Sequence, residues 1–271
     1  MTVWLNGEIV EDGTASVSAM DHGLTVGDGV FETMRVYGGT PFARRRHLDR
    51  MAASAAGLGI GLPPRAVLER AIDEVLAASG LADARLRVTV TGGVGPAGSG
   101  RGDGPPTVLA VACELDPLPA TAAVITVPWT RNENSPLAGL KTTSYGENVV
   151  ARARATAAGA DEAIFANTRG ELCEGTGTNI AVVVGGRLVT PPLSSGCLAG
   201  VTRALAVEHC GIDEAVVPYG ALGEIDEACL LGTTREVQPI TAADGQRAAV
   251  GDRTRAAQAA FRALVEHDLD P

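Results

Sequence analysis

Short glycine turns between apolar runs recur along this chain, and they constrain its fold more than any other feature. Asn6-Gly7, Gly38-Gly39 and Gly185-Gly186 each separate two runs of strand-forming residues. Two-residue turns of this kind connect antiparallel strands. Because helical segments lie between the hairpins and no repeat period is present, we expect an α+β (mixed α/β) fold with two domains, not one parallel βαβ sheet.

The spacing of apolar residues predicts the helices and the remaining strands. Gly80 follows one helical segment as a C-terminal cap, and Gly200 and Gly211 bracket another. The predicted helices cover 47–58, 64–79, about 144–158, 200–211 and the residues after Asp252. Besides the hairpins, the predicted strands are 84–91, 107–115, 123–128, 161–167, 171–175 and 227–233.

One proline-containing stretch, "DPLPA" at 116–120, is the best candidate for a linker, because its two prolines fit neither a helix nor a central strand. A chain of 271 residues, 45% of them hydrophobic, can form one large core or two modest ones. We therefore predict a smaller α+β domain at 1–115, a linker at 116–122 and a larger domain at 123–271 that carries the reactive lysine discussed below.

Charge and composition exclude several classes of function. The formal net charge of -10 lacks the basic face that nonspecific nucleic-acid binding requires. No apolar run approaches a membrane-spanning length, and the N-terminus lacks a signal-peptide pattern. The five cysteines form no CxxC pair and the four histidines lack metal-ligand spacing. We expect a cytoplasmic protein with reduced thiols, no metal site, no nucleic-acid partner and no membrane partner.

The loop at 92–104 contains a misleading motif. "GVGPAG" at 93–98 matches GxGxxG and follows a predicted strand. A dinucleotide site would require a helix to begin there, but the chain continues "SGRGDGPP", which cannot be helical. We interpret the segment as a flexible loop whose Arg101 offers a fixed positive charge for a carboxylate.

Lys141 is the one lysine in the chain, whereas arginine occurs 21 times. Lysine and arginine are nearly interchangeable as solubilising surface charges, so a bias toward arginine can remove lysines without physical cost. It cannot replace a nucleophilic amine, because the guanidinium group stays protonated and does not form imines. Chance survival of a single lysine is the alternative. Its position, after an irregular stretch and before a predicted helix, favours a catalytic role.

Six segments, in this order, resemble the class IV (fold-type IV) aminotransferases, which use pyridoxal 5′-phosphate. The family includes branched-chain and D-amino-acid aminotransferases, (R)-amine transaminases and 4-amino-4-deoxychorismate lyases. The similar segments are 26–42, 44–51, 139–155, 161–183, 191–206 and 227–240, which together span nearly the whole chain. The resemblance implies two domains with the cofactor at their interface.

The resemblance also implies roles for individual residues. Lys141 would hold the cofactor as a Schiff base and then move a proton as general base and acid. Glu174, in "CEGTG", would face the pyridine nitrogen and keep the ring an electron sink. The phosphate ligands would be Arg50, the helix N-terminus at Val201 and Thr202, and the hydroxyl of Thr233.

The remaining candidates surround the substrate. Tyr145 is expected at the cofactor's phenolate oxygen, although a tyrosine of the core fits its position equally well. Phe31 and Arg35 alternate onto one strand face and either line the pocket or pack. Arg101 and Thr234 complete the predicted substrate contacts.

Departures from the family pattern guide the expected substrate. "FETMR" replaces the F-E-G-I-R of branched-chain enzymes, and the R-x-H carboxylate trap of D-amino-acid transaminases is missing. We expect transamination between a D-amino acid, or an (R)-amine, and a 2-oxo acid, with Arg101 replacing the trap. A 4-amino-4-deoxychorismate lyase is the first alternative and a branched-chain L-amino-acid aminotransferase the second. The resemblance further implies a homodimer in which loop 92–104 completes the partner's pocket.

Overall fold

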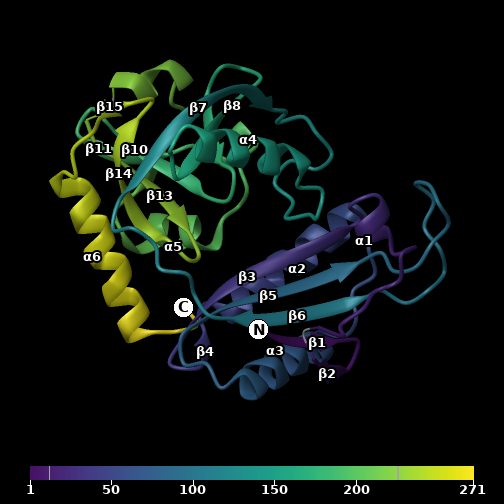
Figure 1. Ribbon diagram of the computed structural model, residues 1–271. Coiled ribbons are helices and arrows are strands. Elements are labelled where there is room, and N and C mark those ends of the chain that lie inside the picture. Colours follow the sequence, from purple (N-terminus) through teal and green to yellow (C-terminus); the bar gives the residue numbers. More distant parts are fainter. Residues whose placement is uncertain (12, 225) are drawn as a thin grey trace. The chain divides into compact units, whose positions relative to one another are not determined.

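The computed structural model describes residues 1–11, 13–224 and 226–271, and the chain divides into two compact units. Unit 1 comprises Met1–Asp116, Leu140–Tyr145 and Asp270. Unit 2 comprises Pro117–Gly139, Gly146–Leu269 and Pro271. Each unit contains its own sheet and its own helices, so the predicted α+β class is confirmed (Figure 1).

Unit 1 is built on a six-stranded antiparallel sheet with the strand order β2-β1-β6-β5-β3-β4. The predicted hairpins at Asn6-Gly7 and Gly38-Gly39 are confirmed. The strands are β1 Thr2–Leu5, β2 Glu8–Val10, β3 Gly29–Tyr37, β4 Thr40–Pro41, β5 Ala84–Thr91 and β6 Val108–Cys113. The helices are α1 His22–Thr25, α2 Arg44–Leu58 and α3 Arg65–Ser79.

The two faces of this sheet differ because side chains alternate along each strand. Val30, Met34 and Leu86 belong to the face that packs with α2 and α3 into one apolar core (Figure 1). The opposite face of β3 carries Phe31 and Arg35. The pattern predicted a two-faced strand, and the helix-covered face is the one that includes Glu32.

Both long helices of unit 1 end at a glycine with a left-handed backbone. Gly59 caps α2 with φ 70°, and Gly80 caps α3 with φ 65°. Residues with a Cβ rarely adopt this conformation, so glycine ends each helix where the chain must turn away. The predicted cap at Gly80 is confirmed.

The segment Leu140–Tyr145 pairs with β3, although it lies far away in the sequence. β4 covers only the far end of β3, which leaves its first residues open for pairing. Thr142 forms an antiparallel bridge to Val30, and Thr143 N–H donates to the carbonyl of Gly29 at 2.8 Å. The sequence had assigned Lys141 to the C-terminal domain, whereas this hydrogen bonding places its segment in unit 1.

Unit 2 contains a nine-stranded mixed sheet. Its order is β12-β11-β10-β13-β14-β7-β8-β9, with β15 beside β14. The hairpin at Gly185-Gly186 is confirmed as β10–β11, while β7 runs parallel to both β8 and β14. Its strands are β7 Ala122–Arg131, β8 Glu162–Asn167, β9 Leu172–Gly175, β10 Asn179–Val184, β11 Arg187–Thr190, β12 Asp213–Glu214, β13 Ala228–Gly232, β14 Glu236–Ala243 and β15 Gln246–Arg247.

Three α-helices pack in unit 2, namely α4 Gly146–Ala157, α5 Val201–His209 and α6 Asp252–His267, together with the short 3₁₀ turns η1 Leu193–Ser195 and η2 Tyr219–Glu224. All three α-helices were predicted, whereas strand β14 was not. The first residues of β14 lie in the family-like segment 227–240, for which the sequence predicted a strand only at 227–233. None of the helices among the described residues is long and apolar enough to cross a membrane.

Candidate active site

The backbone around Lys141 is held by two elements of unit 1. Its carbonyl accepts a hydrogen bond from Phe31 N–H at 3.2 Å, and its N–H donates to Ser54 Oγ of α2 at 3.1 Å. On its far side, Thr143 Oγ1 and Ser144 Oγ donate to the carbonyl of Gly27 at 2.8 and 3.0 Å. The position of Lys141 is therefore determined by β3 and α2 together.

The ring of Phe31 is the centre of a cluster of reactive and charged side chains. Lys141 Nζ lies 4.4 Å from the ring centroid, and the Tyr145 ring packs edge-on with centroids 5.3 Å apart. The guanidinium carbon of Arg87, from β5, lies 3.7 Å from the same centroid. Cations are attracted to an aromatic ring, which explains the two basic groups beside Phe31. The Tyr145 phenol ring packs against the same side chain.

Of these residues, Arg87 was not found by the sequence reasoning. It lies opposite Thr33 of β3, on the same sheet face as Phe31. The alternation of "ARLRVTVT" gave the signal, because it places Arg87 on the polar face of the strand next to β3. Only the strand pairing shows which residues lie beside it.

Arg50 lies on α2 in a buried ion-pair network. Its Nε donates to Glu32 Oε1 at 2.8 Å and its Nη2 to Oε2 at 2.6 Å. His47 Nδ1 contacts the same Oε2 at 2.7 Å. Glu32 is fully buried, and Arg50 keeps 11% of its side chain exposed. Glu32 was also missed; the signal is a carboxylate on the core-facing side of an alternating strand.

The network shifts the ionisation of both partners of Arg50. Burial opposes the charge of Glu32, but the Arg50 guanidinium and the hydrogen bonds outweigh it and lower the pKa to about 2. Burial, together with the charges of Arg50 and Lys141, lowers the pKa of His47. A neutral His47 that donates from Nδ1 to an ionised Glu32 satisfies both shifts.

Arg101 does not join the Phe31 cluster. Its Nε and Nη2 donate to the two carboxylate oxygens of Asp28 at 2.7 and 2.6 Å. Its Nη1 and Nη2 also donate to the carbonyls of Gly59 and Leu58, each at 2.7 Å. Each of the three guanidinium nitrogens thus has a partner within unit 1, and a contact of Arg101 with a substrate carboxylate stays a prediction. Arg35 instead lies over the Tyr37 ring, 4.6 Å from its centroid.

In unit 2, Glu174 is held from two sides at the end of β9. Its Oε2 accepts the Leu198 backbone N–H at 2.9 Å, and its Oε1 lies 3.3 Å from Nε of Arg131. Arg131 in turn lies over the Phe165 ring, 4.1 Å from its centroid. Glu174 is therefore a positioned carboxylate, not a solvated loop charge. Arg131 was not identified from the sequence, where it only follows a predicted strand.

The predicted phosphate-binding turns meet at one end of the unit 2 sheet. Gly200 directly precedes α5 and lies close to Asn179. A Cβ added at Gly200 would lie 2.0 Å from Asn179 Oδ1. Gly232 ends β13 close to Thr178, the residue before Asn179. A Cβ added at Gly232 would lie 3.1 Å from Thr178 Cγ2. Val201 and Thr202 open α5, so their backbone N–H groups face out of the helix end. Thr233 and Thr234 follow Gly232 in a turn.

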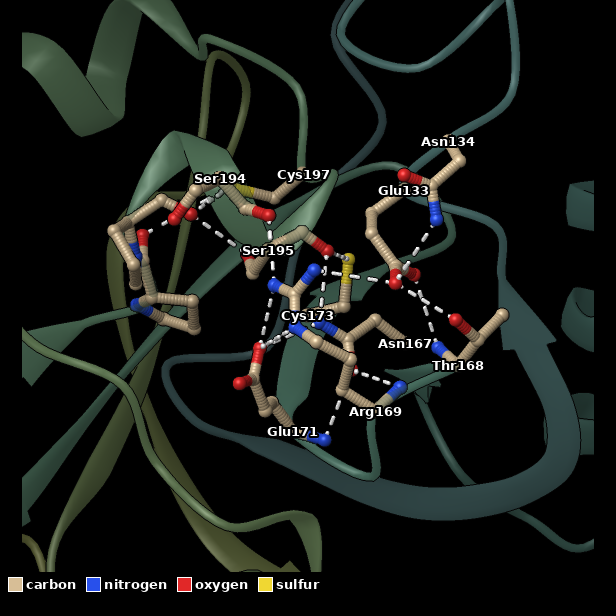
Figure 2. Close-up of polar contacts among 12 residues, drawn as sticks. Glu133, Asn134, Asn167, Thr168, Arg169, Glu171, Cys173, Ser194, Ser195 and Cys197 are labelled. Atoms are coloured by element: carbon tan, nitrogen blue, oxygen red, sulfur yellow. Dashed lines mark hydrogen bonds and ion pairs between the residues drawn. The ribbon is translucent and has the colours of Figure 1, made fainter.

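A polar cluster fixes the segment that donates to Glu174. Figure 2 shows Arg169 between Glu133, Glu171 and Ser194, with its Nη2 donating to the Ser194 carbonyl at 2.8 Å. The Ser195 carbonyl accepts from Cys173 Sγ at 3.4 Å, and burial raises the pKa of this thiol. Since Leu198 follows this segment, the cluster sets the position of its N–H toward Glu174.

Glu162 supports the turn that follows Glu174. Its Oε1 accepts the Thr176 N–H at 3.1 Å and the Thr176 hydroxyl, and its Oε2 accepts Thr178 Oγ1 at 3.2 Å. Asn148 of α4 donates its Nδ2 to the Thr176 carbonyl. A buried carboxylate thus shapes the 175–178 turn that leads into Asn179.

The chemistry found within each unit suits a phosphorylated pyridine aldehyde. Unit 1 contains an amine and a guanidinium. Unit 2 contains a helix N-terminus, hydroxyls and a positioned carboxylate. Gly200 has no room for a side chain beside Asn179, and it leads directly into the N-terminus of α5, where backbone N–H groups can bind an anion. Among the residues that the structure describes, no group of three His, Cys, Asp or Glu side chains could hold a metal ion.

Comparisons with known proteins agree with this donor set. The sequence model of the family described as amino-transferase class IV matches residues 29–243. A Methanocaldococcus jannaschii protein, provisionally named a branched-chain-amino-acid aminotransferase, is 37% identical over 258 residues, which cover 91% of this chain and 89% of that protein. The D-alanine aminotransferase of Bacillus licheniformis is 30% identical over 260 residues, covering 91% and 89%.

Two further proteins complete the comparison. The aminodeoxychorismate lyase of Bacillus subtilis is 30% identical over 251 residues, covering 88% of this chain and 85% of the lyase. The crystal structure of a branched-chain aminotransferase from Thermoproteus uzoniensis with norvaline superposes with a TM-score of 0.85. It is 30% identical and the match covers 98% of this chain and 94% of that one.

The buried network around Glu32 leads to a stability prediction. Replacing Glu32 with Gln leaves Arg50 without its anionic partner and should lower the free energy of unfolding by about 3–5 kcal/mol near neutral pH. Since folding lowers the pKa of Glu32 from 4.5 to about 2, its contribution is present above pH 4.5 and is lost as pH falls toward 2. The difference in the free energy of unfolding between wild type and Glu32→Gln should therefore become smaller as the pH falls.

Urea unfolding followed by circular dichroism across this pH range measures both quantities. Glu69→Gln is the matched control, because Glu69 pairs with Arg65 on the exposed side of the same unit. The Glu69→Gln substitution should lower the free energy of unfolding by less than about 1 kcal/mol. A Glu32→Gln variant as stable as this control at neutral pH would contradict the assigned network.

Proposed function

The chain belongs to the class IV aminotransferases, whose cofactor is pyridoxal 5′-phosphate, and from this premise we propose that it transfers an amino group from an L-amino acid with an aliphatic side chain to a 2-oxo acid. The observation that carries the proposal is the Lys141 amine against the Phe31 ring, with Tyr145 and Arg87 on the same ring. An amine, a phenol and a carboxylate-binding cation are the groups this reaction uses.

The residues that would hold the cofactor are assigned from the family resemblance. Lys141 Nζ would bond its aldehyde carbon, and Tyr145 is assigned to its phenolate oxygen. Glu174 is assigned to the pyridine nitrogen, where an anion favours the protonated ring. The phosphate is assigned to Arg50, Val201, Thr202 and Thr233. When bound, pyridoxal phosphate supplies an aldehyde that accepts the amino group and a ring that withdraws electrons from the substrate Cα.

Lys141 would also move the proton that transamination requires. Its Nζ would take the proton from the substrate Cα as general base and would give a proton back as general acid. Ser54 and Phe31 hold the Lys141 backbone, so the amine returns to the same place in each cycle. Arginine at this position would stay protonated and could not do this work.

Arg87 is our candidate for binding a substrate carboxylate. Its guanidinium and the Lys141 amine both contact the Phe31 ring, and a guanidinium binds a carboxylate through two parallel hydrogen bonds. Arg35 and Thr234 remain candidates for the rest of the pocket. The apolar ring of Phe31 would then contact the aliphatic side chain of the donor.

The L-amino-acid assignment revises the expectation from the sequence. D-amino-acid donors were favoured from the sequence, with Arg101 as the candidate that would replace the missing R-x-H trap; the contacts of Arg101 with Asp28, Leu58 and Gly59 weaken the case for that role. The greater similarity to the Methanocaldococcus jannaschii protein favours the branched-chain group. The lyase reaction stays an alternative, because the Bacillus subtilis lyase is as similar as the D-alanine aminotransferase.

A donor panel distinguishes these reactions. With 2-oxoglutarate as acceptor, L-leucine or L-valine should support turnover, while D-alanine and (R)-1-phenylethylamine should not. Turnover with D-alanine alone would establish the D-amino-acid reaction instead. Release of 4-aminobenzoate and pyruvate from 4-amino-4-deoxychorismate, without any transamination, would establish the lyase.

We also propose that the chain forms a homodimer, as the family resemblance implies. Light scattering coupled to size-exclusion chromatography measures the mass in solution. A mass of 27.6 kDa, that of one chain, would exclude the dimer.

Replacement of the sole lysine gives the most direct prediction. Lys141→Ala should lower turnover by at least about a hundredfold, and Lys141→Arg should not restore it. Borohydride should attach the cofactor irreversibly to wild type and to neither variant. Since the chain has no other lysine, the mass of the intact protein identifies the attachment site. Wild-type turnover in either variant would exclude the proposed role.

The second prediction separates the electronic role of Glu174 from cofactor binding. Glu174→Gln should keep the bonds to Leu198 and the shape of the site, but slow the proton transfer by about tenfold or more. Cofactor affinity, measured by fluorescence titration, should change much less. The half-reaction rate with L-leucine, followed by stopped-flow absorbance, tests this, and an unchanged rate would refute the role.

The third prediction concerns Arg87. Arg87→Ala should raise the KM of the amino donor about 10- to 100-fold, because a charge-assisted hydrogen bond to its carboxylate is lost. Arg85→Ala is the matched control, since Arg85 pairs with Asp116 and lies two residues along the same strand. If Arg87→Ala and Arg85→Ala raised KM equally, Arg87 would not be the specific ligand of the substrate carboxylate.

A further inference from the structure

Parts of loop 92–104, which the composition predicts to be flexible, pack closely against unit 1. An added Cβ at Gly95 would lie 2.5 Å from His22 Nε2, and one at Gly102 would lie 2.6 Å from the carbonyl of Val94. The buried His22 contacts the Pro96 carbonyl at 3.0 Å. Gly95 and Gly102 therefore mark the places where the loop backbone approaches its neighbours too closely for a side chain.

Arg101 connects this loop to two elements that carry the Lys141 segment. It binds both carboxylate oxygens of Asp28, directly before β3, and the carbonyls of Leu58 and Gly59 at the end of α2. Asp28 is also within 3.8 Å of His22 Nδ1. The side chain of Arg101 therefore joins the loop, the start of β3 and the C-terminus of α2 at one point.

The residues next to these contacts hold the lysine segment. Gly27 and Gly29, on either side of Asp28, accept the hydrogen bonds from Thr143 and Ser144. Ser54, one helical turn before Leu58, accepts the N–H of Lys141. An added Cβ at Gly57 would lie 2.8 Å from the Leu140 side chain, so α2 also contacts this segment by close packing.

From these contacts we infer that Asp28 and Arg101 are a positioning pair that sets the placement of the Lys141 amine without touching the substrate. The inference rests on the proposed function of Lys141 but not on the identity of the substrate. Without the pair, the start of β3 and the end of α2 lose their common partner, and the lysine segment bound to both gains freedom. Small displacements of a reacting group are enough to slow a reaction strongly.

The test compares Arg101→Ala, Arg101→Lys and Asp28→Asn with wild type. Each variant should lower kcat about tenfold and change KM less than about threefold, because the amine is misplaced while the substrate contacts remain. Arg101→Lys should not rescue kcat, since an ammonium cannot make the planar paired contact with Asp28 and also reach both carbonyls. The double variant should be no slower than either single variant.

A second measurement needs neither substrate nor cofactor. Because Lys141 is the sole lysine, its labelling by an amine-selective reagent in the cofactor-free full-length chain reports its environment directly. N-terminal labelling is distinguished by peptide mass. The labelling rate of Lys141 should change severalfold in all three variants. Arg65→Ala, which removes an exposed ion pair to Asp49 of α2 in the same unit, is the control and should leave both kcat and the labelling rate unchanged.

The outcomes separate the possible roles. Unchanged kcat and labelling in Arg101→Ala and Asp28→Asn would overturn the positioning pair, as would loss of thermal stability alone. A rise in KM with unchanged kcat would also overturn it, because that pattern assigns Arg101 to substrate binding. If wild type shows no transamination, the proposed function fails, and the labelling rates still decide the placement of Lys141. Should Arg101→Ala not fold, Arg101→Gln and Asp28→Asn provide the same comparison.

Discussion

The buried carboxylate of Glu32 is the constraint on which the arrangement around Lys141 depends. A carboxylate without water requires positive or donating groups to satisfy its oxygens. Arg50 and His47 supply them, and both come from α2. Because the two residues are three apart on the helix, their common partner fixes how α2 is rotated against β3. The interaction thus orients every other residue on that side of the helix.

The same side of α2 makes the contacts that matter for the lysine segment. Arg50, Ser54 and Leu58 follow one another at four-residue intervals, so they form one stripe along the helix. Arg50 binds Glu32, Ser54 accepts the N–H of Lys141, and the carbonyl of Leu58 accepts from Arg101. A helix held by a buried ion pair at one end can therefore connect the Gly-rich loop with the reactive amine. Glu32 matters to the chemistry although it contacts neither substrate nor amine.

In unit 2, Glu174 and the start of α5 are positioned mainly through backbone geometry. Glu174 is positioned by a backbone N–H of Leu198, and the segment of Leu198 is held by the Arg169 cluster. At Gly200, directly before α5, the chain approaches Asn179 too closely for any side chain. A site made of glycines and backbone donors costs little conformational entropy, because no long side chain has to be ordered for it.

The sequence by itself determined most helices and strands and the mixed α+β class, and it predicted Lys141 as the reactive amine. Apolar periodicity and glycine caps are local signals, and a lone amine among arginines is visible without any contact map. The tertiary structure alone decided which charges are partners. Arg87 and Arg101 are equally basic in the sequence, yet strand pairing brings Arg87 to Phe31 while Asp28 binds Arg101. Such partnerships join residues distant in the chain, and they depend on side-chain directions that only the packed fold sets.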